Sequence, residues 1–545
     1  MKSFFLNKKN TPDVLFIIIL VIQISLIIFG CAGKTLTGDE YFSYSTANND
    51  QGFLYYTRGY IDLISETGWI KGDGIRELLT VENGDQFDLL STYRQARSNV
   101  HPPLFYMLLH LTSGIIPGQL SHWTGSFWNV LFAVAILVLL YKLSQLLFKD
   151  KYVALIAPFI WGFSSAASVL TTYVRMYTML CLMCLLILYF HVYLFDEKKW
   201  STKNLLLLAA CVTIGGLTHH FFYVFLGFSC ITYFIILLIR KSKLRKLITY
   251  CVTIGSGIFA ELCVYPYFIK QIFFGYRGTE AQENFASSDM AEYFRKVTSG
   301  LRTINKRALN GYFTLLLIFI LILFVIACIL YFYRKNNKNK IHAESCLTDN
   351  AKTAFIYIAI SGLLYILVLT KVAYAPLWTY ISPAYIPTLL SCIAAIVLLC
   401  NYINPKYIFV IFIPILLLTT IRHIPERISS THANYIRFQE IDKTLRSHEG
   451  SDVIFCYEEW DNIFYGRMAD MIYMDEIYSI DCSTLQDNTL PSILELREDK
   501  DALLLYLPYD SEHKEEYLRM VETQLQMQTE ILYEYGHVSA YVLIP

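Results

Sequence analysis

The sequence predicts an all-α polytopic membrane domain with about eleven transmembrane helices, followed by a small α/β domain. Apolar residues make up 55% of the 545-residue chain and charged residues only 17%, which is too apolar for a soluble globular protein. Long apolar runs recur up to about residue 421, and beyond it the chain becomes charged and changes its periodicity. The formal net charge is zero, so the composition gives no support for a nucleic-acid partner.

Eleven apolar runs approach the length of about 20 residues that a membrane-spanning helix needs. They lie at residues 14–33, 126–148, 153–173, 177–194, 205–217, 221–239, 247–267, 312–332, 353–370, 382–399 and 407–421. Lys and Arg gather in alternate connections, for example at Lys8, Lys9 and residues 240–246. Because basic residues are retained on the cytoplasmic side, the alternation predicts a multi-pass protein of the cell membrane with a cytoplasmic N-terminus. Residues 34–104, residues 268–311 and the chain after residue 421 are then outside.

Two segments admit more than one interpretation. The apolar segment 104–118 is expected to be an interfacial or re-entrant helix, because a twelfth span there would place the later basic connections outside. Pro102 and Pro103 suit its first turn, where their missing N–H groups cost nothing. The first run is alternatively a signal peptide, since residues 28–31 faintly resemble a lipobox, but its length and the bulky Phe29 favour a transmembrane helix.

The part after residue 421 is predicted to be an extracytoplasmic α/β domain, so that the chain divides into residues 1–421 and 422–545. Its periodicity predicts a helix at 431–448, strands at 453–457 and 502–507, a helix at 511–526 and a hairpin of 531–535 with 538–544. It shows no nucleophile motif and no metal-ligand spacing. Its expected role is a lid or an acceptor-binding platform, with a purely structural role as the alternative.

The cysteines and the cytoplasmic connections give no sign of a redox, metal or nucleotide site. Ten of the thirteen cysteines lie in apolar runs, where a thiol packs as a small hydrophobe. A disulfide between Cys456 and Cys482 of the C-terminal part is left open. The longest cytoplasmic connection, about residues 333–352, is basic and has no glycine-rich phosphate loop. Function is therefore expected on the outer face.

Two adjacent carboxylates, Asp39 and Glu40, follow the first apolar run by a few residues. At headgroup depth one carboxylate can take a proton from an acceptor hydroxyl, and its neighbour can hold a cation or orient a sugar. The alternative interpretation is a solvated acidic start of a loop.

Two basic side chains are expected at a similar depth. His101 stands before the proline pair at the expected start of a helix, and the N-terminus of a helix favours anions. Arg175 stands in a short outer turn, where basic residues are under-represented. Both are candidate phosphate ligands. The alternatives are a polar residue at a helix entry for His101 and a snorkelling anchor for Arg175.

Further candidates lie at the outer ends of later runs. His219 and His220 can bind metal or phosphate, but adjacent residues of a helix point about 100° apart, so only one is expected to face a given site. Glu261 is a candidate because an intramembrane carboxylate is costly and often functional. Its alternative is a pair with Lys270. The cations of the loop that follows could cover a phosphate, and the loop is equally a solvated amphipathic helix.

The order of these motifs resembles that of the GT-C superfamily of membrane glycosyltransferases. The chain reads Asp39-Glu40-Tyr41, His101-Pro102-Pro103-Leu104, Arg175-Met176-Tyr177 and Thr218-His219-His220-Phe221. The resemblance covers about residues 10–400 and is greatest to bacterial members related to protein O-mannosyltransferases and lipid A aminoarabinose transferases. It implies a GT-C-like fold for the membrane domain.

The resemblance also implies transfer of a sugar, a hexose or a pentose, from a polyprenyl-phosphate donor to an acceptor at the outer face, usually with inversion. Asp39 would be the general base with Glu40 beside it, and His101 and Arg175 would hold the lipid phosphate, whose charge must be stabilised as the glycosidic bond breaks. The remaining candidates for substrate binding are Tyr177, His219, His220, Glu261, Lys270 and, at the outer end of the tenth run, Tyr380.

The chain departs from these relatives at three places. Thr379 stands where they often have an arginine before the tyrosine, and Tyr173 stands where an acid often precedes the Arg-Met-Tyr arginine. No arginine enters the second span near residues 127–129. These departures weaken the inference that this chain makes the same phosphate and acceptor contacts as its relatives. They do not change the expected transferase class.

Several points stay open at the level of sequence. The acceptor is a cell-surface glycan, a lipid or a protein, and the sugar is not named. Metal dependence is open: Asp39, Glu40 and one of His219 or His220 could bind a divalent metal ion, but no residue spacing demands it. The alternative function is a transporter or flippase of lipid-linked sugar, which is disfavoured because the polar residues concentrate outside and not along a path at mid-membrane.

Overall fold

The computed structural model describes residues 11–49, 69–337, 346–373, 377–403, 407–458, 467–487, 489–494, 503–509, 511–535 and 538–545. The chain divides into two compact units. One, called here the helical unit, consists of residues 1–31, 100–104 and 127–430, and the other, the α/β unit, consists of residues 32–99, 105–126 and 431–545. The predicted division into residues 1–421 and 422–545 stays a prediction.

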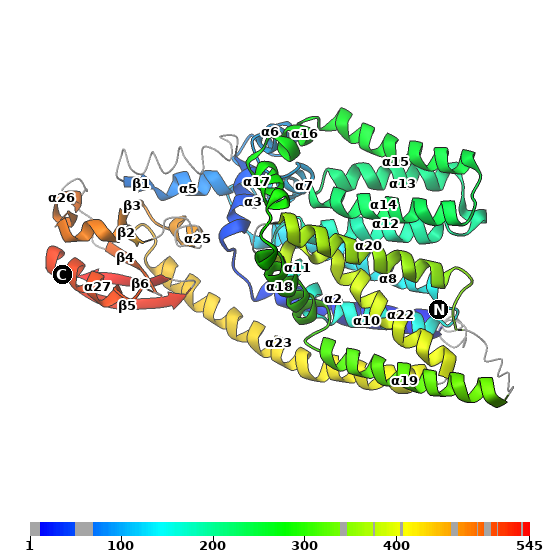
Figure 1. Cartoon of the computed structure of the whole chain (residues 1–545). Helices are drawn as coiled ribbons and strands as arrows, with labels where there is room; N and C mark the ends of the chain where they lie inside the picture. The colour runs from blue at the N-terminus through cyan, green and yellow to red at the C-terminus, as the bar shows by residue number, and fades with distance from the viewer. Residues whose placement is uncertain are drawn as a thin grey trace. The chain divides into compact units, whose positions relative to one another are not determined.

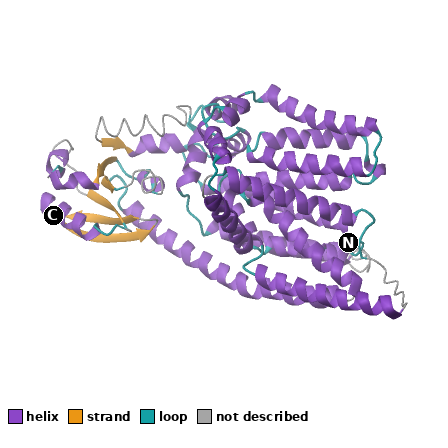
Figure 2. Ribbon diagram, viewed as in Figure 1, coloured by secondary structure: helices purple, strands orange, loops and turns teal. Residues whose placement is uncertain are grey.

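Helices make up the described part of the helical unit (Figures 1 and 2). In chain order they are α2 (Thr11–Ala32), α8 (His122–Leu147), α9 (Lys151–Ala154), α10 (Ile156–Gly162), α11 (Ser165–Thr172), α12 (Tyr177–Tyr193), η2 (Glu197–Lys199), α13 (Thr202–Gly216), α14 (Phe221–Ile239), α15 (Leu244–Val264), α16 (Tyr267–Phe273), α17 (Tyr276–Ala286), α18 (Met290–Ala308), α19 (Phe313–Asn337), α20 (Ala351–Val372), α21 (Leu377–Tyr380), η3 (Ser382–Ala384), α22 (Tyr385–Ile403) and α23 (Tyr407–Ser447). Residues 122–126 of α8 and 431–447 of α23 belong to the α/β unit. Helix α13 packs on α15, α14 packs on α20, and α19 and α20 both pack on α22 (Figure 1).

Within the described residues, seven helices are long and apolar enough to cross a membrane, so the chain is a multi-pass membrane protein. They are Thr11–Ala32, His122–Leu147, Phe221–Ile239, Leu244–Val264, Phe313–Tyr333, Ala351–Val372 and Ser382–Cys400. An eighth span would be the pair Lys151–Gly162 and Ser165–Thr172, which is bent by 52°. The membrane fold class is confirmed, but the expected number of eleven spans is not.

The remaining predicted runs have identifiable reasons for falling short. The run at 153–173 is interrupted because Ser164 accepts a hydrogen bond from the N–H of Ala167 and so starts a new helix. Helices α12 and α13 have 17 and 15 residues, which is below the usual length of about 20 residues for a span. The last run is the beginning of α23, a helix of 41 residues that contains Pro414 and Pro425.

The α/β unit contains a six-stranded sheet with the order β1-β3-β2-β4-β6-β5 (Figure 2). Its strands are β1 (Trp69–Lys71), β2 (Asp452–Tyr457), β3 (Glu476–Asp481), β4 (Leu503–Pro508), β5 (Gln528–Tyr535) and β6 (Val538–Ile544). Strand β2 is parallel to β3 and β4, and the other neighbours are antiparallel. Every residue of β4 is buried, as expected for a strand covered on both faces.

Helices and short turns complete this unit. They are α3 (Gly38–Asn48), α5 (Gly72–Leu79), α6 (Leu89–Ala96), α7 (Leu104–Ser113), α25 (Met468–Met471), η4 (Cys482–Asp487), α26 (Leu490–Leu494) and α27 (Lys514–Leu525). The segment expected as an interfacial helix forms α7, whose 10 residues are too few to span a membrane. His110 of α7 bonds through Nδ1 to the carbonyl of Ala47 in α3 over 2.8 Å, which ties the two helices together.

The C-terminal prediction was right for its main elements, and the structure answers the question of the disulfide that the sequence left open. Strands β2 and β4, helix α27 and the terminal hairpin of β5 with β6 are confirmed. Strands β1 and β3 were not anticipated. Cys456 and Cys482 are free thiols that are packed in the apolar core of the unit with Leu505 and Val521.

Candidate functional site

Five of the predicted site residues come together in the helical unit. His101 lies just before α7, Arg175 lies between α11 and α12, and His219 lies between α13 and α14. The ring of His219 is 4.9 Å from that of His101, 5.7 Å from that of Tyr177 and 6.0 Å from that of Tyr380, measured between centroids. Arg175 Nη2 lies 3.5 Å from His101 Nε2. These five residues are called the histidine–arginine cluster below.

The turn that presents Arg175 is held by its own backbone and by Asn129. Helix α11 ends at Thr172, and the N–H of Arg175 donates to the carbonyl of Tyr173 over 2.7 Å. The amide of Asn129, a fully buried residue on α8, donates to the same carbonyl over 2.6 Å. Asn129 was missed as a functional residue, and its only sequence signal is an amide within an apolar run. Through this hydrogen bond the Asn129 amide positions the turn that carries Arg175.

The histidines of the cluster are buried and neutral. Burial, followed in size by the effect of His219 and Arg175, holds the pKa of His101 well below its usual range. Burial, followed by the effect of His220 and Arg175, does the same for the pKa of His219. A neutral imidazole keeps one N–H donor, and the hydrogen bond made by the other nitrogen decides which one it is.

The surrounding contacts identify those donors. His219 Nδ1 accepts from the N–H of Phe221 over 3.0 Å, so the proton is on Nε2. Arg175 can only donate, so His101 Nε2 accepts and Nδ1 carries the proton. Both of these protonated nitrogens are buried and have no hydrogen-bond partner among the described residues. A buried donor without a partner is costly, which indicates a place for a ligand acceptor.

The cluster therefore has the composition of an anion site. It combines one permanent cation, Arg175, which is only 6% exposed, with the two neutral N–H donors of His101 and His219. A guanidinium and neutral donors suit a phosphate, because Arg binds its oxygens through planar charge-assisted hydrogen bonds. Burial strengthens these interactions relative to water.

His220 faces different neighbours from His219, as expected for adjacent residues. Its Nε2 lies 3.1 Å from Gln271 Oε1, and Gln271 Nε2 donates to the hydroxyl of Tyr265 over 2.9 Å. Burial, partly offset by the bond to Gln271, lowers the pKa of His220 to about 4. A role for His220 in substrate binding stays a prediction, and Gln271 is a partner that the sequence analysis missed.

Glu261 has a partner other than the expected Lys270. Its side chain is fully buried on α15 and accepts a hydrogen bond from the hydroxyl of Tyr223 on α14. An ideal Cβ on Gly216 would lie 1.8 Å from Glu261 Oε2, so the absence of a side chain there makes room for the carboxylate. Lys270 is exposed on α16. Substrate roles for Glu261 and Lys270 stay predictions.

The two adjacent acids lie at the start of α3, in the α/β unit. Glu40 is fully buried and accepts from the N–H and the hydroxyl of Thr37 over 3.0 and 2.9 Å. Lys34 Nζ lies 2.5 Å from Glu40 Oε1. Asp39 is exposed in the first turn, where the helix dipole favours a carboxylate. The structure thus gives the two acids different environments.

The expectation of a divalent ion gains no support from the described residues. Within them, no group of three or more His, Cys, Asp or Glu side chains lies close enough to hold a metal ion. The histidines of the cluster are arranged around Arg175, whose positive charge disfavours a second cation. A metal ion therefore stays a prediction of the sequence.

One family model matches part of the chain. Residues 100–265 match the family model PMT_2, dolichyl-phosphate-mannose-protein mannosyltransferase. No curated protein matches the chain.

Two similar solved structures are those of ArnT from Cupriavidus metallidurans, one bound to undecaprenyl phosphate and one in the apo state. Each is 11% identical and covers 98% of both chains, with TM-scores of 0.46 and 0.45. The family match includes His101, Arg175 and His219, and over residues 100–265 it confirms the resemblance to GT-C membrane glycosyltransferases that the motifs indicated.

Proposed function

We propose that this protein is a membrane glycosyltransferase that moves a sugar from a polyprenyl-phosphate donor to an acceptor hydroxyl at the outer face of the membrane, with inversion. The observation that carries the proposal is the histidine–arginine cluster. It combines Arg175 with two buried N–H donors that have no hydrogen-bond partner among the described residues, and the three residues lie within the stretch that matches the model of a dolichyl-phosphate-mannose-protein mannosyltransferase family.

The reaction has a simple balance of bonds and charges. The bond between the anomeric carbon and the phosphate oxygen breaks, and its electron pair leaves with the polyprenyl phosphate. Arg175, His101 Nδ1–H and His219 Nε2–H would stabilise the charge that develops on that oxygen. The acceptor oxygen forms the new bond to the anomeric carbon from the opposite face, and its proton passes to a carboxylate base.

Asp39 is the proposed base. Its carboxylate is exposed, so an acceptor hydroxyl can reach it, and it is the acid of the pair that is not buried. Glu40 has a contribution of another kind, because its contacts to Thr37 and Lys34 hold the start of α3. Glu40 would thereby position Asp39, and a direct contact of Glu40 with acceptor or cation is the alternative.

The test is release of polyprenyl phosphate from a polyprenyl-phosphate sugar by the purified protein. Asp39→Asn should lower the rate by about 10²- to 10⁴-fold, as for the loss of a general base, and leave donor binding intact. Asp73→Asn is the matched control, because Asp73 is an exposed acid in the first turn of another helix of the same unit. Unchanged turnover in Asp39→Asn would remove Asp39 as base.

Two further outcomes of the same assay decide the remaining alternatives. Movement of intact lipid-linked sugar across vesicles, without release of polyprenyl phosphate, would favour a flippase. Loss of turnover after treatment with a chelator, restored by one divalent cation, would support the metal ion. A screen of hexose and pentose donors identifies the sugar.

A further inference from the structure

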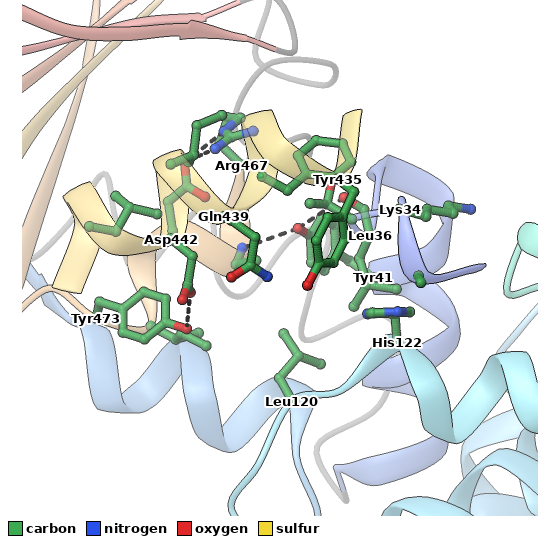
Figure 3. Close-up of a pocket in the computed structure, with 18 residues that line it drawn as sticks. Lys34, Leu36, Tyr41, Leu120, His122, Tyr435, Gln439, Asp442, Arg467 and Tyr473 are labelled. Atoms are coloured by element: carbon green, nitrogen blue, oxygen red, sulfur yellow. Dashed lines mark hydrogen bonds and ion pairs between the residues drawn. The ribbon is translucent and has the colours of Figure 1, made fainter. Parts of the chain in front are cut away.

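A cavity of about 310 Å³ lies within the α/β unit (Figure 3). Its wall includes Lys34, Tyr41, His122, Gln439, Asp442 and Tyr473. Gln439 and Asp442, on α23, point toward the space beside Leu120, His122 and Tyr473 (Figure 3). The volume corresponds to about ten water molecules, which is enough for one or two sugar rings.

The charged groups of this wall are already paired. Lys34 Nζ lies 2.5 Å from Glu40 Oε1. Arg467 Nε donates to Asp470 Oδ2 over 2.7 Å, and this pair is almost fully buried. Asp442 accepts from Arg446 Nε over 2.9 Å. A cavity whose charges are compensated in this way favours a neutral ligand over a phosphate or an anionic headgroup, which would need cations of its own.

The uncharged groups of the wall are those that suit a sugar. Tyr41, Tyr435, Phe438 and Tyr473 contribute aromatic rings, and an aromatic face packs on the apolar C–H face of a pyranose. The hydroxyl of Tyr473 donates to Asp442 Oδ1 over 3.0 Å, which orients that carboxylate at the cavity. A carboxylate and an amide offer the acceptors and donors that sugar hydroxyls require.

Gln439 and Tyr435 are the polar side chains best available to a ligand. Both are exposed, and neither side chain makes a hydrogen bond to another described residue. Tyr41 on the opposite wall is buried and fixed, since its hydroxyl donates to the carbonyl of Leu36 over 3.2 Å and accepts from the N–H of Ala469 over 3.2 Å. The site thus combines a rigid wall with accessible polar groups, as ligand pockets commonly do.

We propose that this cavity binds a neutral saccharide and, on the basis of the proposed function, that the saccharide is the sugar end of the acceptor. Helix α3 supports the second part, because it contributes Tyr41 to the cavity and has Asp39, the proposed base, in its first turn. The acceptor would then be a glycan or glycolipid with a neutral terminal sugar. A protein acceptor would not need the cavity.

The test measures binding of neutral disaccharides of glucose, galactose, mannose and N-acetylhexosamines to the full chain in lipid nanodiscs, by saturation-transfer NMR. At least one should bind, and Gln439→Ala and Tyr435→Ala should each weaken it about tenfold, as for the loss of one hydrogen bond of about 1.4 kcal/mol. The matched controls are Gln528→Ala and Tyr509→Ala, which change exposed residues of the same unit that do not line the cavity.

Three results would overturn the proposal: no disaccharide binds, the cavity variants bind as tightly as the unchanged protein, or only acidic peptides or anionic lipid vesicles bind. Failure of the proposed function is separable from these. Arg175→Gln should bind the disaccharide as tightly as the unchanged protein and should bind polyprenyl phosphate more weakly. The donor site and the cavity are thus tested by different ligands.

Discussion

Substitution of Arg175 by glutamine tests the donor site most directly. Arg175 is 6% exposed and lies 3.5 Å from His101 Nε2, so water screens its charge little. A hydrogen bond to a charged group contributes about 1.5–3 kcal/mol, which corresponds to about 10- to 150-fold in affinity. Arg175→Gln should weaken the binding of a polyprenyl phosphate by a factor in this range. Arg175→Lys keeps the positive charge and loses the planar guanidinium, so its affinity for polyprenyl phosphate should lie between those of the unchanged protein and Arg175→Gln.

The assay is equilibrium binding of a radiolabelled polyprenyl phosphate to the full chain in nanodiscs. Arg295→Gln is the control. The Arg295 side chain on α18 is 80% exposed, and the substitution removes the same charge elsewhere in the helical unit. The Tm of each variant shows whether the fold is retained. An unchanged Kd in a folded Arg175→Gln protein would refute the assignment of the cluster as a phosphate site.

Two predictions concern stability. The pKa of folded His220, about 4, is below the ordinary value, so the unfolded chain takes up the proton first as the pH falls. Stability should therefore decrease between about pH 6.5 and 4, by up to about 1.4 kcal/mol per pH unit for this group. His220→Gln should make Tm decrease less as the pH falls, whereas the exposed control His513→Gln should leave this decrease unchanged. If Tm depends on pH equally in the two variants, the lowered pKa of His220 is contradicted. Gly257→Ala on α15 would place a Cβ 2.6 Å from the carbonyl of Ala209 on α13 and should cost about 1–3 kcal/mol, whereas Gly255→Ala, with nothing within 4 Å, should leave Tm unchanged or slightly higher. A similar Tm for the two glycine variants would argue against close packing of these helices.

The membrane helices could be predicted because local composition determines them. The same reasoning failed where a single polar contact decides the outcome. The run at 153–173 is uniformly apolar enough for one helix, yet the cap formed by Ser164 divides it. The bounds of α12 and α13 agree with the predicted runs 177–194 and 205–217 within a few residues, and Ser201 caps α13 by accepting from the N–H of Asn204.

The sheet shows the limit of periodicity in another way. Strand β4 is apolar throughout and was predictable, whereas β3 alternates polar and apolar residues only in part. Strand β1 has three residues and exists because Trp69, Ile70 and Lys71 pair with β3, which is about 400 positions away in the sequence. No local pattern contains that information.

Five of the ten candidate site residues come together in the structure, but their chemistry could not be predicted from the sequence. The order of the motifs indicated His101, Arg175, His219 and Tyr380, and the structure brings them together. It does not follow from the sequence that the two histidines are neutral donors, because that depends on burial and on the contacts of their other nitrogens. The resemblance assigned the base to Asp39 and a supporting place to Glu40, but the sequence does not show that Asp39 is exposed and Glu40 fully buried.

The two units have compositions that match the two substrates of the proposed reaction. A polyprenyl phosphate carries a long apolar chain and a compact anion, and the helical unit provides apolar helices together with a buried guanidinium and N–H donors. A glycan acceptor is polar and uncharged, and the α/β unit provides a cavity with compensated charges, aromatic rings and an exposed carboxylate on α3. A buried guanidinium beside N–H donors suits a phosphate, and a cavity whose charged side chains are paired suits a neutral sugar, so the chemistry of each unit is itself an argument for which substrate it receives.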